Sequence, residues 1–104
     1  MPRSIILRAR AEHDIRGIFE WYESQQSRLG DEFLSQLRDV LEAVRARPES
    51  APVIYKNVRR AVVPKFPYLV FYVAESVRVV VLAVLHSSRR PTNWPRLQRD
   101  RAAR

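Results

Sequence analysis

Residues 68–86 have the sequence YLVFYVAESVRVVVLAVLH, and this stretch decides the fold. Its segments 68–73 and 77–85 are rich in aromatic and β-branched residues, which favour strands. Glu75 and Ser76 lie between the two segments and provide a short turn. The second segment is apolar on both of its faces, which predicts an inner strand of a sheet. Because the link is short, we expect the two strands to pair as an antiparallel hairpin.

Two further strands and two helices are predicted upstream of this hairpin. Strands are expected over 4–8 and over 58–63, the latter followed by a turn at Pro64 and Lys65. Apolar residues at helical spacing predict two helices between these strands. Those residues are Ala11, Ile15, Ile18, Phe19 and Tyr22 in the first helix, and Phe33, Leu37, Val40, Leu41 and Val44 in the second.

Single residues refine the helix predictions. Glu12 and Asp14 are expected in the first turn of the first helix, where carboxylates complement the helix dipole. Gly17 lowers the helix propensity and is expected to allow a neighbour to pack closely. Gly30 is predicted to separate the two helices, and Pro48 to end the second.

The element order is therefore β-α-α-β-β-β, which predicts an α+β fold. We expect a small antiparallel sheet with an N-terminal helical hairpin packed on one face. The length of 104 residues fits a single domain over 1–104, with a frayed tail over about 96–104.

Composition excludes several classes of protein. The chain has no cysteine and two histidines, so we expect no metal and no cofactor. Its two glycines cannot form a phosphate-binding loop. No segment has the length of a membrane span or the pattern of a signal peptide, so a cytoplasmic protein is predicted.

Charge is divided unevenly along the chain. Residues 1–52 carry 8 basic and 9 acidic side chains, whereas residues 53–104 carry 11 basic and 2 acidic ones. The basic half indicates an acidic partner, either nucleic acid or an acidic protein segment.

Basic and aromatic side chains are predicted to meet at one end of the sheet. In an antiparallel hairpin, the start of strand 68–73 lies beside the end of strand 77–85. Lys65, Tyr68, His86, Arg89 and Arg90 should therefore converge there. Alternatives exist: the tyrosine can be a core residue, His86 can cap a strand, and Trp94 can cover a sheet edge.

The chain resembles the RelE/ParE superfamily of bacterial type II toxins over about residues 4–95. The resemblance rests on the order and spacing of Asp14-Ile15 through Trp21-Tyr22, Gly30 with Phe33, Pro48, Val58-Arg59-Arg60, Phe66-Pro67-Tyr68 with Phe71-Tyr72, and Val84-Leu85-His86 through Arg89-Arg90-Pro91 to Trp94. It implies the fold predicted above and a growth-arresting toxin controlled by an antitoxin.

The resemblance implies one of two targets. RelE-like members cleave mRNA on the ribosome, and here that chemistry would use His86, Arg60, Lys65 and Arg89. ParE-like members inhibit DNA gyrase without nuclease chemistry. The nuclease pattern has an Arg where this chain has Leu69, so we favour the ParE-like branch and no enzymatic activity. A non-toxic module that binds antitoxin or DNA is a further alternative.

The same resemblance implies two binding surfaces. The target surface is expected to include Arg59, Arg60, Arg89, Arg90 and Trp94. An acidic, partly disordered ParD-like antitoxin is expected to fold along the helices and the sheet, and to be the only link to operator DNA. Its contacts are expected at Ile18, Trp21, Tyr22, Phe33, Leu37, Arg60 and Tyr72.

Overall fold

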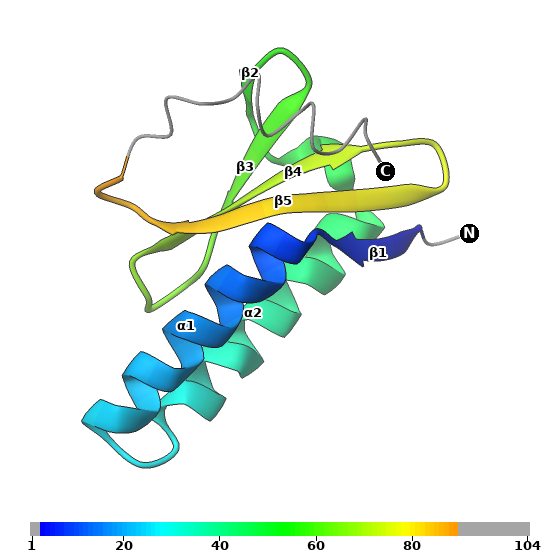
Figure 1. Cartoon of the computed structure of the whole chain (residues 1–104). Coiled ribbons are helices and arrows are strands. Elements are labelled where there is room, and N and C mark those ends of the chain that lie inside the picture. The colour runs from blue at the N-terminus through cyan, green and yellow to red at the C-terminus, as the bar shows by residue number, and fades with distance from the viewer. Residues whose placement is uncertain (1–2, 90–104) are drawn as a thin grey trace.

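A five-stranded sheet carries a helical hairpin on one face (Figure 1). The computed structural model describes residues 3–89. Along the chain the elements are β1 (Ser4–Leu7), α1 (Ala9–Gln25), α2 (Leu29–Ala46), the 3-10 helix η1 (Pro48–Ser50), β2 (Val53–Tyr55), β3 (Val58–Val62), β4 (Tyr68–Ala74) and β5 (Arg78–His86). The predicted α+β class is confirmed.

The sheet differs from the prediction in two ways. Its strand order is β1-β5-β4-β3-β2, and β1 pairs with β5 in parallel, so the sheet is mixed. The parallel pair arises because the helical hairpin separates β1 from the rest of the chain, whereas short turns join the other strands. The second difference is strand β2, which pairs antiparallel with β3 and was not predicted. Its three residues are too few for an alternating pattern to be visible.

Helix α1 begins earlier than the apolar pattern suggested, which changes the role of Asp14. The helix starts at Ala9, so Glu12 lies in the first turn and Asp14 lies beyond it. The Asp14 carboxylate instead accepts a hydrogen bond from the backbone N–H of Val84 at 3.0 Å. Its other oxygen accepts from Arg10 Nε at 3.1 Å. Asp14 therefore ties α1 to β5.

Helix α2 also begins earlier than predicted. Gly30 lies inside its first turn, because Arg28 adopts a left-handed conformation (φ 75°) and turns the chain before it. The Glu23 carboxylate of α1 accepts hydrogen bonds from the N–H groups of Gly30 (2.8 Å) and Asp31 (3.3 Å). The end of α2 at Ala46, shortly before Pro48, confirms the predicted boundary.

Apolar side chains fill both faces of the sheet. On the helix side, Val70, Tyr72, Val79, Val81 and Val84 pack with the buried residues of α1 and α2. On the other side, β3, β4 and β5 contribute a separate buried cluster. The register between β4 and β5 shifts at Leu82, so Leu82 and Ala83 both belong to that second cluster. No helix among residues 3–89 is long and apolar enough to cross a membrane.

Candidate functional site

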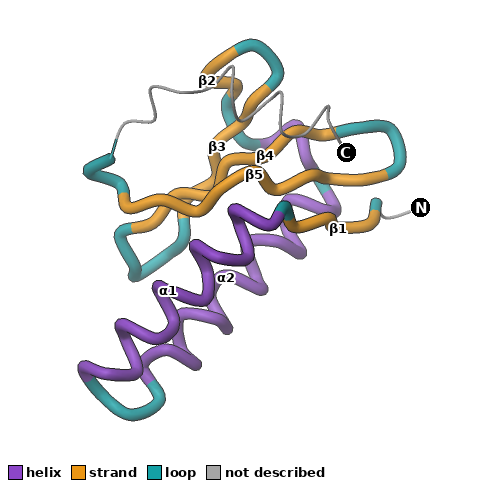
Figure 2. The backbone as a smooth tube through the Cα atoms, in the orientation of Figure 1, coloured by secondary structure: helices purple, strands orange, loops and turns teal. Residues whose placement is uncertain are grey.

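The structure brings Tyr68, His86 and Arg89 together at one end of the sheet, as predicted. Tyr68 lies directly opposite His86 in the β4–β5 ladder. Beyond the ladder, the Ser87 N–H donates to the Pro67 carbonyl at 2.7 Å. Lys65 lies exposed in the preceding turn, with φ 71°. Arg89 follows in the turn after β5, drawn in teal in Figure 2, while Arg90 lies outside the described residues.

A cavity of about 270 Å³ lies between this sheet end and α1. Helix α1 and strand β5 supply most of its lining, and both histidines of the chain are included. The lining residues are His13, Asp14, Gly17, Ile18, Tyr68, Val84, Leu85, His86 and Arg89. His13 and Gly17 were not among the predicted site residues, although their four-residue spacing places them on one helix face.

Gly17 does not serve close packing, which corrects the earlier expectation. A Cβ atom added to Gly17 would have no heavy atom within 4 Å. The residue is exposed at the edge of the cavity.

A second cavity of about 390 Å³ adjoins the first, because Tyr68 and His86 line both. Trp21, Tyr22 and Pro67 complete its lining. Trp21 is 56% exposed, which is unusual for so large an aromatic side chain. We call the two adjoining cavities the α1 groove, a hollow with an aromatic end at Trp21 and a basic end at Arg89.

Aromatic rings pack against one another beneath the α1 groove. Tyr22 contacts Phe33, Phe66 and Tyr68 with ring centroids 6.0, 5.0 and 6.2 Å apart. Tyr68 also meets the His86 ring edge to face at 5.4 Å. Burial, followed by the nearby Tyr68, raises the pKa of the Tyr22 hydroxyl above its ordinary value of 10.0.

The hydrogen bonds of His86 limit its chemistry. The Ser88 backbone N–H donates to His86 Nδ1 at 3.0 Å, and Ser88 Oγ lies 2.8 Å from the same nitrogen. Since a backbone N–H can only donate, Nδ1 is an acceptor, and a neutral His86 carries its proton on Nε2. The lone pair that a general base needs is therefore already engaged.

Arg60 lies on the opposite face of the sheet from the α1 groove. It pairs in register with Phe71, whose side chain belongs to the cluster away from the helices. Tyr68, three residues before Phe71, packs on the helix side. The structure therefore brings His86 and Arg89 together and separates Arg60 from them.

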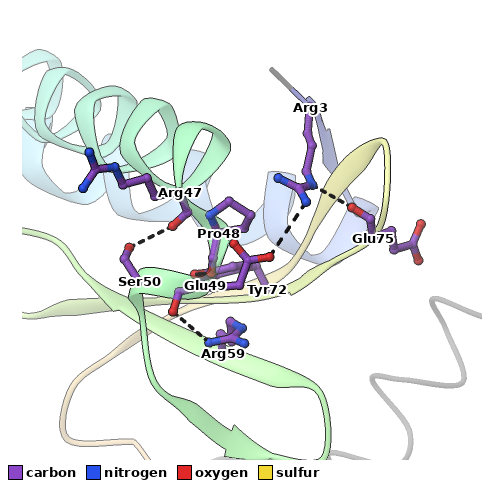
Figure 3. Close-up of polar contacts among 8 residues, drawn as sticks. All are labelled: Arg3, Arg47, Pro48, Glu49, Ser50, Arg59, Tyr72 and Glu75. Carbon is purple, nitrogen blue, oxygen red and sulfur yellow. Dashed lines mark hydrogen bonds and ion pairs between the residues drawn. The ribbon is translucent and has the colours of Figure 1, made fainter. Parts of the chain in front are cut away.

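Hydrogen bonds to backbone carbonyls hold the Arg59 guanidinium. Its Nη1 donates to the Ala51 carbonyl oxygen at 2.6 Å. It also donates to the Glu49 carbonyl oxygen at 3.2 Å, as Figure 3 shows. Arg3 reaches the same segment through an ion pair with Glu49 at 3.8 Å. These contacts hold the segment after α2 against the sheet.

Tyr72 lies beneath this segment and is fully buried. Its hydroxyl donates to the Pro48 carbonyl at 2.6 Å (Figure 3). Burial raises the pKa of Tyr72 above 10.0, with a smaller lowering by Arg59 and a raising by Glu49.

The side chains expected to bind an antitoxin lie at different depths. Ile18, Phe33, Leu37 and Tyr72 are buried in the core, and Tyr22 is partly buried. Trp21 and Arg60 are exposed. Trp94, expected on the target surface, lies outside the described residues together with Arg90.

No group of three metal-binding side chains lies within residues 3–89. In that part of the chain, the site is a hollow with Trp21 and Tyr22 at one end and Asp14 and Arg89 at the other.

The fold is shared with a solved structure. It matches a chain of the solved structure described as "Chromosomal ParDE TA system from P. aeruginosa", with a TM-score of 0.71 at 11% sequence identity. The match covers 81% of this chain and 95% of the other. No curated protein sequence matches the chain.

The family follows from the sequence. The family model "ParE toxin of type II toxin-antitoxin system, parDE" matches residues 5–91. The chain belongs to this family of ParE toxins. Membership in a ParDE system implies that an antitoxin is its partner.

Proposed function

We propose that the protein is a toxin that arrests growth by inhibiting DNA gyrase, without enzymatic activity of its own. Membership in the ParE family supports this target. Gyrase acts on DNA in the cytoplasm, so the toxin would act there.

One observation carries the choice of gyrase over RNA cleavage: the candidate nuclease residues are not assembled. Arg60 lies across the sheet from His86 and Arg89. The Nδ1 lone pair of His86 accepts a hydrogen bond from Ser88. Leu69 occupies the position where the nuclease pattern has an Arg, and a leucine cannot stabilise charge on a phosphate.

The target surface is proposed to include the exposed basic groups Arg60 and Arg89, with Arg90 next to Arg89 in sequence. Arg59 contributes less, because its guanidinium is held by backbone carbonyls of η1 and Ala51. Fixed positive charge at these positions would favour contact with gyrase or its bound DNA.

The antitoxin is proposed to be an acidic ParD-like protein that places one segment in the α1 groove. An apolar anchor would contact exposed Trp21, and carboxylates would pair with Arg89 at the other end. Operator DNA would be bound through the antitoxin alone.

A supercoiling assay with purified toxin and gyrase tests this function. We expect toxin at micromolar concentration to block supercoiling, and a Glu substitution at Arg89 to weaken the block at least tenfold. Arg38→Glu, the same charge change on the exposed side of α2, is the matched control and should leave the block unchanged.

A translation extract tests a second candidate function. His86 and Arg89 line one cavity, which is the observation that favours a ribosome-dependent nuclease as second candidate. The ribosome, and not gyrase, would be the target if three results hold. The mRNA is cleaved in the extract, this cleavage is lost in His86→Ala, and supercoiling is unaffected. No growth arrest on expression without antitoxin would instead favour a non-toxic binding module.

A further inference from the structure

Gly17 is an unfavourable residue for the place that it occupies. It lies in the middle of α1, which runs from Ala9 to Gln25, and it is exposed. Among the amino acids, only proline disfavours a helix more than glycine does. Gly17 has no positive φ that would require a glycine, and a Cβ atom added to it would meet no described heavy atom within 4 Å. Packing and backbone conformation within residues 3–89 therefore leave this glycine unexplained.

Gly17 lies at the centre of the row of residues that α1 contributes to the α1 groove. His13 precedes it by four residues and Trp21 follows it by four, so the three share one side of the helix. His13 and Gly17 line the first cavity, and Trp21 lines the second. A helix rises 1.5 Å per residue, so the row spans about 12 Å. The missing side chain at its centre leaves a notch between His13 and Trp21.

The charges around this notch favour an acidic partner. Arg89 and His86 line the cavity from the sheet side. Asp14 is the acidic residue of the same lining, and both of its oxygens are already engaged. One accepts from the Val84 N–H at 3.0 Å, and the other accepts from Arg10 Nε at 3.1 Å. An approaching carboxylate would therefore find the Arg89 guanidinium as its complement.

We propose that an acidic segment of the antitoxin crosses α1 at Gly17, with its backbone in contact with the Gly17 Cα. A side chain at this position would hold that backbone away from the helix. The close approach would bring an apolar side chain of the segment against Trp21 and a carboxylate to Arg89. The proposal rests on the placement of the antitoxin in the α1 groove, and it does not depend on gyrase as the target.

Substitution of Gly17 tests the proposal through the affinity for the full-length cognate antitoxin. We expect Gly17→Ala to weaken binding by about tenfold and Gly17→Leu by roughly a hundredfold, because a growing gap removes the contacts on both sides of it. Titration calorimetry measures the affinity. An unchanged affinity in Gly17→Ala would overturn the proposal, since a single methyl group is enough to prevent backbone contact.

The same substitutions at Ser35 provide the matched control. Ser35 is exposed in the middle of α2 and is also uncharged. Ser35→Ala and Ser35→Leu should leave the affinity unchanged. Thermal unfolding of the toxin alone completes the control, because Gly17→Ala should unfold at a higher temperature than the wild type. Unfolding at a lower temperature would show that the chain itself packs on Gly17, and it would contradict the proposal.

The fluorescence of Trp21 locates the antitoxin on the toxin. The chain has two tryptophans, so Trp94→Phe leaves Trp21, which is 56% exposed, as the single emitter. Saturation with an antitoxin that lacks tryptophan should shift its emission to shorter wavelength and reduce acrylamide quenching several-fold. An unchanged spectrum at saturation would place the antitoxin elsewhere and overturn the proposal.

The supercoiling assay keeps this proposal separate from the proposed target. A toxin that leaves supercoiling unaffected would refute gyrase inhibition, whereas the order of antitoxin affinities in the Gly17 series would still support the crossing at Gly17. Weaker inhibition of gyrase by Gly17→Leu with an unchanged antitoxin affinity would place the target at Gly17 instead, and the proposal would be wrong.

Discussion

The two glycines of the chain both lie in helices but have opposite surroundings. A Cβ atom on Gly17 would meet nothing within 4 Å. A Cβ atom on Gly30 would lie 2.7 Å from Glu23 Cγ, Phe19 Cδ1 and the Phe19 carbonyl oxygen. Gly30 therefore allows α1 and α2 to approach closely at the hairpin, whereas the sequence pattern predicted this role for Gly17.

Gly17→Ala and Gly30→Ala should change the free energy of unfolding in opposite directions. We expect Gly17→Ala to raise the free energy of unfolding by about 0.5–1 kcal/mol, because alanine favours the helix and meets no neighbour. Gly30→Ala should lower it by about 1–3 kcal/mol through overpacking. Urea denaturation of both variants provides the measurement, and shifts of equal sign would contradict the assignment.

Tyr72 combines a buried ring with a hydrogen bond from its hydroxyl to the Pro48 carbonyl. Tyr72→Phe should cost about 1–3 kcal/mol at neutral pH, because the Pro48 carbonyl loses its donor inside the protein. The change should not alter the fold, since the ring remains.

The Tyr72 hydroxyl should also make stability depend on alkaline pH. Its pKa is raised in the folded state, chiefly by burial, so folding favours the protonated form. That contribution is complete below the unfolded pKa of about 10 and is lost as the pH rises through the folded pKa. Denaturation at pH 8 and pH 11 should show a smaller gap between wild type and Tyr72→Phe at the higher pH. A gap that widens would oppose this assignment, and Tyr22→Phe controls for the other tyrosine with a raised pKa.

Helix α2 obtains its N-terminal cap from another helix. Arg28 stands at the cap position without a side-chain hydrogen bond, and Glu23 of α1 accepts from Gly30 and Asp31 instead. The carboxylate also complements the positive end of the helix dipole. The cap thus links the start of α2 to the last turns of α1.

Removal of this cap should destabilise the hairpin. We expect Glu23→Ala to cost about 1 kcal/mol, as loss of other N-caps does, and Glu23→Gln to cost less because an acceptor oxygen remains. Glu20→Ala, at an exposed position of the same helix, is the control. Thermal unfolding of the three variants measures how much stability each one loses. Equal losses at Glu20 and Glu23 would argue against a capping role.

The strength of the local pattern determined which elements could be predicted. The helices and strands β4 and β5 are long enough for their periodicity to identify them, and Pro48 ended α2 as expected. Strand β2 has three residues, which are too few to show an alternating pattern of apolar and polar side chains. The direction of β1 depends on its pairing with β5, more than seventy residues later, and no local signal contains that information.

The site was predictable where it depends on register and not where it depends on side-chain depth. Antiparallel pairing alone placed Tyr68 beside His86. The same reasoning could not foresee that Tyr72 is sealed beneath Pro48, or that Arg59 binds backbone carbonyls. His13 was missed because a polar residue on an exposed helix face is ordinarily solvated.

The uneven charge of the whole chain should govern the rate at which the antitoxin binds. Residues 53–104 carry 11 basic against 2 acidic side chains, so an acidic antitoxin would be attracted before contact. We expect the association rate constant to fall by roughly tenfold between low and high salt, with a smaller change in dissociation. Stopped-flow measurements over a salt series test this, and an unchanged association rate would exclude electrostatic steering.

The hydrogen bond from the Val84 N–H to the Asp14 carboxylate has a consequence for self-association. Strand β1 pairs with β5 only as far as Val81, so within residues 3–89 the later part of that strand edge has no partner strand. Unpaired edges are templates on which further chains can add and start fibrils. Here α1 lies along the edge, and Asp14 already occupies the N–H of Val84 that an incoming strand would need. A helix that follows the first strand directly thus protects this rim of the sheet from aggregation.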